Sequence, residues 1–349
     1  MAPQTLSPRE LNRALLHRQM LLERSDRSLT EVIEGMGGVQ NQYAPAGYIG
    51  LWSRMRHFER PMLTRAFEAR QVIQGTLMRA TIHLVSAPDY WPMRAGIERI
   101  NREWYAKVQA REIGDVDLDE VVDATRRELA DGPLRIGELS ERLVARGLPA
   151  RAAAWASFSV PMVRVPPSGT WERRRADIYG LADQWLPRPD VTEDAGIELL
   201  IRRYLGAFGP ASLKDIAGWM GLNVGQMRHV ADAMELRPLR GEDGKRMVDL
   251  PDAPLPDADT PAPPRFLAVW DAQLLVHARR TEVLPEELRH MIFNTRTPHS
   301  HNTFLLDGRV AGTWRFEEGE IRLSPLRRLT AAERAPLEDE AHRLAAFHR

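Results

Sequence analysis

Residues 71–85 read QVIQGTLMRATIHLV and depart from the pattern of everything before them. Val72 and Ile73, and then Ile82, Leu84 and Val85, form two groups of β-favouring residues interrupted by a glycine. The preceding residues instead carry apolar side chains at helical spacing. Three or four short helices followed by a two-stranded ribbon is the order of a winged helix. This part of the sequence therefore predicts a winged-helix unit at the start of the chain.

Start and stop signals mark the helices that precede the ribbon. Ser7 caps a helix that has Pro8 at its first position and Glu10 three residues after the cap. Gly37 and Gly38 end a second, shorter helix. The expected helices cover residues 8–24, 29–36, 45–58 and 60–69.

The same order of elements recurs twice further along the chain. DGPLRIGELSERL and FGPASLKDIAGWM share a Gly-Pro followed by a helix with regularly spaced apolar residues. This similarity favours tandem units of one architecture, although any two amphipathic helices resemble each other. The predicted elements are a helix at 133–147, two strands within 160–182, a helix at 192–207, a helix-turn-helix pair at 209–222 and 224–234, and a wing strand at 247–250.

A different composition marks the C-terminal part. Six prolines within residues 251–264 indicate a linker or an extended surface crossing. Asp307-Gly308 between two apolar runs predicts a hairpin over 303–316, and Thr330 with Glu333 forms a capping box for a final helix. Residues 265–276 read as strand and then helix, residues 319–329 as strand, and residues 330–347 as helix.

These elements predict an α+β fold that is mostly helical, with tandem winged-helix units and a C-terminal β-rich region. A chain of 349 residues is long enough for two or three such units. The expected divisions are 1–112 for the first winged-helix unit, 113–190 for the second, 191–250 for the third, 251–264 for the linker, and 265–349 for the β-rich region with its terminal helix.

Composition excludes several kinds of chemistry. The chain has no cysteine, which excludes a disulfide framework, a thiolate zinc site, an iron–sulfur cluster and a cysteine nucleophile. No apolar run approaches the ~20 residues of a membrane helix. The N-terminal MAPQTLSPRE has no apolar signal-peptide core, so we expect a cytoplasmic protein.

Charge is balanced overall but unevenly distributed. The formal net charge is zero, which taken alone argues against nucleic-acid binding. Residues 1–112, however, hold 16 basic and 11 acidic residues, whereas the rest of the chain is acidic. Arginine supplies 45 of the 48 basic residues, and its guanidinium binds phosphate bidentately; a high-GC genome would produce the same bias.

The common catalytic motifs are absent: there is no Walker loop, GxGxxG, GxSxG or HExxH. His299 and His301 alternate around a serine, but no acidic cluster completes a metal site, so we expect no metal there. Gln40 and Gln42 are more unusual, since an extended backbone would point both amides the same way. Such a pair can hold a water or read a base edge, or simply cap neighbouring backbone groups.

Five segments resemble the AlkZ/YcaQ family of winged-helix DNA glycosylases and together span almost the whole chain in family order. The resemblance implies tandem winged-helix units around a basic concave face and a C-terminal β-rich part. The segments are LNRALLHRQMLLER (11–24), GVQNQ (38–42), LMRATIHLVSAPDYWPMR (77–94), FLAVWDAQLLVHARRTEVLPEE (266–287) and TFLLDGRVAGTWR (303–315).

In that family, a Gln-x-Gln motif marks the AlkZ-like branch, which removes bulky N7-alkylpurines. These lesions include the interstrand crosslinks made by genotoxic natural products such as azinomycin. Gln40 and Gln42 match the two glutamines, which implies a catalytic role for both and a role for the enzyme in self-resistance. The YcaQ branch has aspartate at the second position. Asn41 departs from the family pattern, where the middle residue is usually apolar.

Candidate DNA contacts come from the wings and the hairpin, where basic and aromatic side chains are grouped. The alternative for each is a solvated surface residue, and the three first-wing residues could instead flank the active site. Trp270-Asp271 reads instead as a buried aromatic beside a turn. The candidates are Arg79, Thr81 and His83 in the first wing; Trp171, Arg173, Arg174 and Arg175 in the second; Arg309 and Arg315 in the hairpin; and the family-like His277, Arg279 and Arg280.

The leading reading is a monomeric, monofunctional DNA glycosylase without cofactor or metal that acts on alkylated or crosslinked double-stranded DNA near the nucleoid. The only lysines, Lys107, Lys214 and Lys245, lie outside every family-like segment, which argues against a Schiff-base lyase step. The alternatives are a non-catalytic winged-helix DNA-binding protein or regulator, and a protein–protein module. Tandem units favour a monomeric enzyme over a dimeric operator reader.

Overall fold

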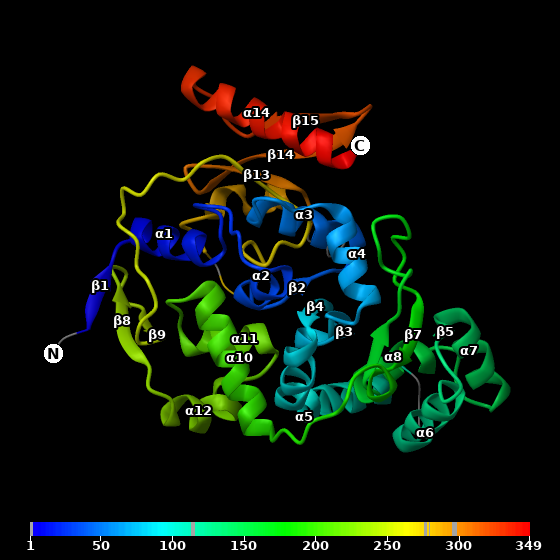
Figure 1. Cartoon of the computed structure of the whole chain (residues 1–349). Helices are drawn as coiled ribbons and strands as arrows, with labels where there is room; N and C mark the ends of the chain where they lie inside the picture. The colour runs from blue at the N-terminus through cyan, green and yellow to red at the C-terminus, as the bar shows by residue number, and fades with distance from the viewer. Residues whose placement is uncertain (1–2, 113–115, 276–277, 279, 295–298) are drawn as a thin grey trace.

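The computed structural model describes residues 3–112, 116–275, 278, 280–294 and 299–349. Its helices and four β-sheets form the predicted α+β fold, with helices surrounding the sheets and a separate sheet in the C-terminal part (Figure 1). Within these residues, no helix has the length and apolar character needed to cross a membrane.

The N-terminal part has the predicted order of short helices followed by a two-stranded ribbon. Ser7 caps the first helix and forms the capping box with Glu10, but that helix ends at Arg18, earlier than expected. A short 3-10 turn, Met78–Ala80, joins the two strands of the ribbon. The elements are α1 (Pro8–Arg18), α2 (Leu29–Gly35), β2 (Val39–Gln40), α3 (Ala44–Arg54), α4 (Arg60–Glu68), β3 (Val72–Thr76) and β4 (Ile82–Ser86).

The next part of the chain completes a six-stranded sheet with this ribbon. β3 pairs with β6 at Gln74–Arg164 and Gly75–Val163, so the first two predicted units share the sheet order β2-β4-β3-β6-β7-β5. Four of the helices, α5, α6, α8 and α9, were not predicted from the sequence. The elements are α5 (Ala87–Glu112), α6 (Leu118–Glu128), β5 (Leu134–Arg135), α7 (Ile136–Ala145), α8 (Ala152–Ser159), β6 (Met162–Arg164), β7 (Ile178–Leu181) and α9 (Ala182–Trp185).

The third part contains the predicted helix-turn-helix pair. Thr192 caps the start of α10, the helix that comes before this pair, through its hydroxyl, as expected. The N-terminal strand β1 (Gln4–Leu6) pairs in parallel with β8, and three residues are too few for this strand to show a sequence period. The remaining elements are α10 (Glu193–Phe208), α11 (Leu213–Met220), α12 (Val224–Ala233), β8 (Arg237–Gly241) and β9 (Arg246–Asp249).

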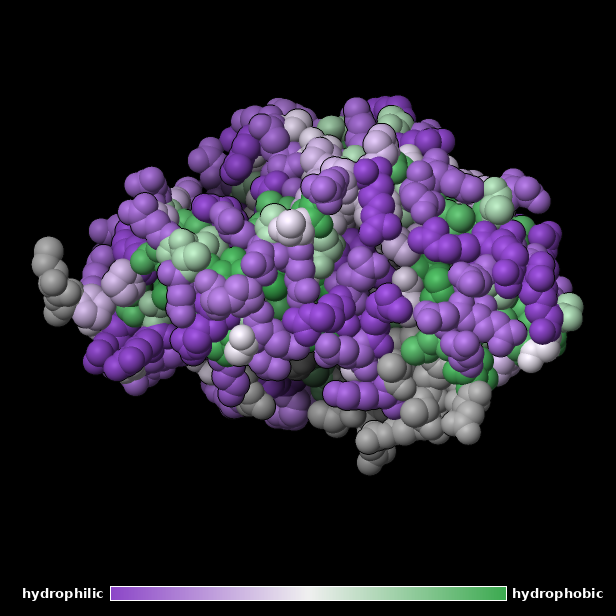
Figure 2. Space-filling model, turned by 90° about the horizontal axis from the view of Figure 1, so that it is seen from below, coloured by the Kyte–Doolittle hydropathy of each residue, from purple (hydrophilic) through white to green (hydrophobic). Residues whose placement is uncertain are grey.

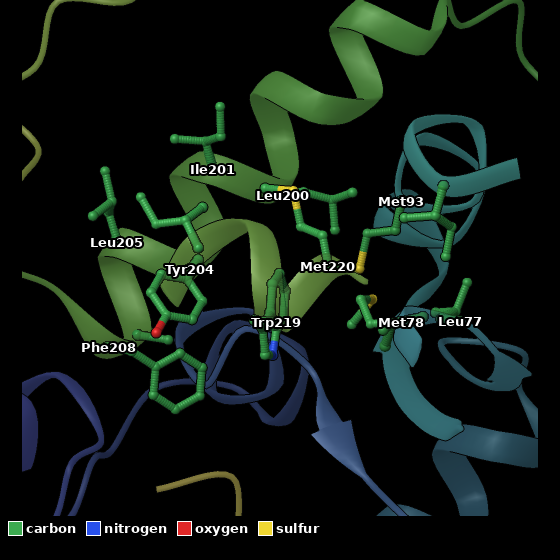
Figure 3. Close-up of a cluster of buried hydrophobic side chains, with 14 of the residues drawn as sticks. Leu77, Met78, Met93, Leu200, Ile201, Tyr204, Leu205, Phe208, Trp219 and Met220 are labelled. Atoms are coloured by element: carbon green, nitrogen blue, oxygen red, sulfur yellow. The ribbon is translucent and has the colours of Figure 1, made fainter. Parts of the chain in front are cut away.

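A single apolar cluster joins the first and third parts. Trp219 of α11 lies between Tyr204 and Phe208 on one side and Met78 of the ribbon turn on the other (Figure 3). The ring centroids of Tyr204 and Trp219 are 5.4 Å apart, a favourable aromatic contact. Burial of these large side chains therefore holds α10 and α11 against the turn that connects β3 and β4.

Two glycines allow α5 and α10 to cross closely. A Cβ atom on Gly196 would lie 2.5 Å from the carbonyl oxygen of Pro92 and would also clash with the backbone of Gly96. We expect Gly196→Ala to lower the free energy of unfolding by about 1–3 kcal/mol through overpacking, measured by chemical denaturation. Gly206→Ala is the matched control in α10: its Cβ meets open space, so it should stabilise the protein by about 0.5–1 kcal/mol. Equal effects at both sites would contradict this explanation.

The C-terminal part forms a four-stranded sheet that α14 covers on one side (Figure 1). Asp307 and Gly308 both have positive φ, 46° and 77°, which confirms the predicted tight hairpin. Residues 268–275 form turns rather than the expected helix. The elements are β10 (Arg265–Leu267), a 3-10 turn (Glu286–Leu288), α13 (Arg289–Ile292), β11 (Phe293–Asn294), β12 (His299–Ser300), β13 (Thr303–Leu306), β14 (Arg309–Glu317), β15 (Glu320–Pro325) and α14 (Ala331–His348).

The proline-rich segment 251–264 is an extended crossing over α1, with no helix or strand. The guanidinium of Arg9 donates to the carbonyl oxygen of Ala258 at 2.8 Å, and that of Arg13 to Thr260 at 2.7 Å. The surface seen from below is mainly hydrophilic, with apolar residues exposed in separate patches (Figure 2).

Candidate functional site

Gln40, Asn41 and Gln42 lie at the end of β2, against the first strand-to-strand turn of the molecule. Gln40 is the register partner of His83 on β4. The amide of Asn41 donates to the carbonyl oxygen of Ile82 at 2.8 Å, so the pairing continues one residue past the strand. Backbone pairing with β4 thus fixes the position of the motif independently of its side chains.

Arg79 holds the side chain of Gln40. Its Nη2 donates to Oε1 of Gln40 at 2.9 Å, and its Nη1 donates to the carbonyl oxygen of Trp219 in the last turn of α11. Burial of the guanidinium lowers the pKa of Arg79 to about 10, which leaves it charged at neutral pH. Among the residues that the structure describes, no carboxylate forms an ion pair with Arg79.

The backbone of Arg79 is strained. Arg79 and the next residue, Ala80, both have positive φ, 53° and 58°, a region that side chains other than glycine and asparagine enter at a cost. This turn directs the guanidinium inward, toward Gln40 and α11. Strain kept at such a position is often associated with function.

The side chain of Gln42 contacts the backbone where the same segment between β3 and β4 ends. Its Oε1 accepts a hydrogen bond from the amide of Ile82 at 2.9 Å, while the residue as a whole is exposed. Both partners of the two glutamines, a guanidinium and a backbone amide, can only donate. The oxygen of each side-chain amide must therefore face its partner, which leaves both Nε2 groups for other contacts.

Asn41 faces the opposite way and supports the next helix. It is 2% exposed, and its Oδ1 accepts from the amide of Gly47 in the first turn of α3 at 3.0 Å. An amide that caps an unpaired N–H of a helix start performs a structural role that an apolar residue cannot. The departure from the family motif is thus accommodated by the N-terminal turn of α3.

A small cavity adjoins Gln40. Its volume is about 10 Å³, close to the space that one water needs, and its lining includes Gln19, Gln40 and Asp271. Asp271 forms a buried ion pair with Arg54 at 2.9 Å, which places a charged pair beside the motif. This agrees with the reading of Asp271 as a structural residue beside a turn. The pairing of Arg54 with Asp271 was not anticipated, because the two residues are far apart in sequence.

The first-wing residues do not share one face as expected. β4 begins only at Ile82, and Arg79 lies in the strained turn, so the alternation predicted for Arg79, Thr81 and His83 is wrong. The Thr81 hydroxyl donates to the carbonyl oxygen of Met78. His83 is 1% exposed and out of reach of a DNA phosphate.

His83 should make the protein sensitive to acid. Burial lowers the pKa of His83 to about 3, and Nδ1 lies 3.0 Å from the carbonyl oxygen of Thr81. The unfolded chain binds a proton at this histidine before the folded protein does, so stability falls as the pH falls from the unfolded value. Between pH 7 and pH 5, this group should cost about 2 kcal/mol of unfolding free energy.

Denaturation of the unmodified protein and of His83→Asn at both pH values tests this expectation. The asparagine amide can replace the Nδ1–H donor but does not titrate. The loss of stability should be smaller in the variant by about 2 kcal/mol. An identical pH dependence would show that His83 is not responsible.

The second wing packs on the body of the protein through Trp171. This ring is 8% exposed, and its centroid lies 5.7 Å from Tyr48 of α3 and 5.4 Å from Phe347 of α14. It is therefore not available for insertion into a DNA groove. Arg173 reaches Asp177 at 3.3 Å, whereas Arg174 and Arg175 are exposed.

The tip of the C-terminal hairpin is docked rather than free. Asp307 at the turn forms ion pairs with Arg13 and with Arg9 of α1, the latter at 2.8 Å, so the tip cannot enter a groove as expected. Arg309 is exposed, and Arg315 is exposed but paired with Glu317 at 2.9 Å.

Arg280 is a core residue rather than a surface cation. It is 6% exposed, its Nη1 donates to the carbonyl oxygens of Ala272 and Gln273, and its guanidinium lies over the ring of Phe208. His277 and Arg279, the other two candidates of this segment, lie outside the described residues.

Comparison with known proteins identifies the class. The family model described as DNA glycosylase AlkZ-like matches residues 33–347, nearly the whole chain. The protein is therefore a DNA glycosylase, an enzyme that cleaves the bond between a base and its sugar. Within that class, it belongs to the AlkZ-like family, as the sequence resemblance predicted.

Two comparisons with Streptomyces sahachiroi proteins agree with this assignment. A relative named interstrand DNA cross-link repair glycosylase is 24% identical over 329 residues, which cover 89% of this chain and 88% of the relative. The solved structure of DNA glycosylase AlkZ matches with a TM-score of 0.80 at 19% identity, over 99% of this chain and 98% of the other. The structural match shows that the fold is shared along almost the entire length.

Proposed function

We propose that Gln40 and Gln42 form the catalytic pair, and that the enzyme hydrolyses the N-glycosidic bond of bulky or cationic N7-alkylpurines, including interstrand crosslinks. The name of the S. sahachiroi relative supports the crosslink as a substrate. The observation that carries the catalytic assignment is the anchoring of both glutamines on one strained connection, Gln40 through Arg79 and Gln42 through Ile82. Such anchoring pre-orients groups that react only when they are correctly placed.

The chemistry requires orientation rather than strong acid or base catalysis. An N7-alkylpurine carries a positive charge, so its bond to C1′ can break with the electron pair leaving on the base, without prior protonation. A water then forms the new bond to C1′ and releases its proton to solvent. Amides do not accept a proton near neutral pH, but each amide oxygen keeps a second lone pair, which can position this water and stabilise the cationic sugar. The water-sized cavity beside Gln40 supports this role.

The substrate is double-stranded DNA, and we infer that exposed arginines near the motif contact its phosphates. Arg174 and Arg175 remain exposed on the second wing, and Arg309 on the hairpin strand. The excess of basic residues in 1–112 favours binding of DNA on the side that carries the motif. We also infer that the enzyme acts as a monomer, since one chain already contains the complete pair of glutamines.

The expected division into units remains part of this proposal. We propose winged-helix units at 1–112, 113–190 and 191–250, followed by a linker at 251–264 and a β-rich region at 265–349. The shared six-stranded sheet joins the first two units rigidly through β3 and β6.

A glycosylase assay tests the proposed function. Duplexes that contain N7-methylguanine, an N7-crosslinked pair or unmodified guanine are incubated with the enzyme, and abasic sites are then cleaved by alkali. We expect strand breaks at both lesions and none at unmodified guanine. Absence of cleavage at both lesions, under conditions where the enzyme binds the duplex, would overturn the proposal.

A further inference from the structure

A pocket of about 520 Å³ opens beside Gln42, and its walls come from segments far apart in the sequence. Six of the fourteen lining residues carry aromatic rings, and the others include Asn302 and two arginines. The rings belong to Tyr43 after the motif, Trp171 of the second wing, Trp270 after β10, Trp314 and Phe316 of β14, and His348 of α14.

We propose that this pocket binds the planar aromatic part of an alkyl group attached to purine N7, rather than the purine itself. This inference rests on the proposed function and specifies the substrate class of the same site. Pockets of this size hold drug-sized ligands and exceed the needs of a bare purine. Flat aromatic surfaces bind planar rings by stacking.

The charges near the pocket favour a neutral occupant. Arg174 donates to the hydroxyl of Tyr43 at 2.9 Å, and Arg315 also lines the pocket. An N7-alkylated purine is a cation, and since Arg315 is paired with Glu317, the guanidinium of Arg174 is the group that would repel it. The attached arene is neutral, and it can extend into the pocket while the purine stays outside.

His348 adds a neutral, stacked ring to the wall. Its ring stacks on Phe316, with centroids 4.4 Å apart and an angle of 18° between the planes. Burial lowers the pKa of His348 to about 4, so the ring is neutral at pH 7. Its Nε2 atom is buried and has no hydrogen-bond partner among the described residues.

The space on the Gln40 side is too small for the same ligand. The cavity there measures about 10 Å³, whereas the pocket beside Gln42 is open to solvent. The two glutamines therefore face different spaces, one of water size and one of ligand size. This arrangement places the water and the adduct on separate sides of the motif.

Two matched substrates test the proposal. One duplex carries N7-methylguanine and the other carries guanine with a naphthylmethyl group at N7, so both purines have the same charge and the same scissile bond. Single-turnover excision rates and duplex dissociation constants are measured for the unmodified enzyme and for Phe316→Ala. We expect the naphthylmethyl-to-methyl ratio to fall about tenfold in the variant, since one stacking partner is lost.

Two further variants separate stacking from stability. Phe316→Leu keeps most of the volume and should still lower the ratio. Ile321 is the cross-strand neighbour of Phe316 but lines a different pocket. Ile321→Ala should therefore leave the ratio unchanged. An equal slowing of both substrates in Phe316→Ala would show that the pocket holds the purine, and unchanged rates for both substrates would show that it holds neither; both results overturn the proposal.

Failure of the proposed function gives a different result. If the unmodified enzyme excises neither base, the hydrolysis assignment is wrong, and the ratio of the two dissociation constants still tests the pocket. A preference for the naphthylmethyl duplex that Phe316→Ala abolishes would then support arene binding without excision.

Discussion

Gln42→Ala is expected to slow single-turnover excision of N7-methylguanine by about 10²-fold or more, because the variant loses a pre-oriented polar group at the reacting sugar. Gln42 is exposed, and within the described part of the chain its side chain accepts one hydrogen bond, from the amide of Ile82. Its removal should therefore leave both folding and duplex affinity nearly intact. The readouts are the excision rate, the dissociation constant for the duplex and the thermal midpoint.

Gln71→Ala is the matched control. Gln71 is also an exposed glutamine at one end of the ribbon, at the start of β3, and it lies outside the motif. We expect its replacement to leave excision unchanged. If Gln42→Ala retains the full excision rate, the assignment of the catalytic pair is wrong.

Arg79→Gly is expected to lower kcat by about 10²-fold while changing KM and duplex affinity little. Arg79 acts through Gln40 and is a positioning residue: without its donor, the amide of Gln40 rotates freely and loses its orientation. Glycine tolerates the positive φ of this position, so the variant removes the guanidinium without adding backbone strain. Measurement of kcat and KM separately distinguishes loss of orientation from loss of substrate binding.

Two companion variants isolate the guanidinium. Arg79→Lys keeps a charged donor and should restore part of kcat. Ala80→Gly relaxes the neighbouring residue of the same turn, which also has positive φ, without removing a polar contact, and should retain activity. A similar loss of kcat in Ala80→Gly would indicate that the conformation of the turn matters and that the contact with Gln40 does not.

Short-range features of the fold could be predicted from the sequence. The capping boxes at Ser7 and Thr330 and the hairpin turn at Asp307 lie where expected. Each depends on groups within a few residues of one another, so the local sequence contains the full physical cause. The same holds for the helix-turn-helix of the third part and for the ribbon over residues 71–85.

Long-range features could not be predicted. Helix α5 packs against α8 and α10, so its apolar residues do not form the single stripe that identifies a helix on a surface. Strand β1 exists because β8 lies beside it, and the first two wings become one sheet because β3 meets β6. These contacts join residues that are distant along the chain.

The candidate site likewise combines features that could be predicted from the sequence with others that could not. The sequence alone singled out Gln40 and Gln42 as paired amides at a loop, and the family resemblance implied their role. Arg79, His83 and Trp171 were expected at the DNA surface because of their residue types, and the structure places all three side chains in the interior. A residue type indicates which contacts a side chain can make, but not which partner it meets.

The α+β class, many of the helix starts, the hairpin turn and the family could be predicted from the sequence alone, because they depend on local propensity and on the order of segments along the chain. The orientation of the two glutamines could not, because it depends on tertiary contacts. Their partners, Arg79 and Ile82, lie about forty positions further along the chain and reach the motif through the pairing of β2 with β4. The aromatic pocket beside Gln42 likewise exists only when residues from the motif, the second wing, β14 and α14 pack together.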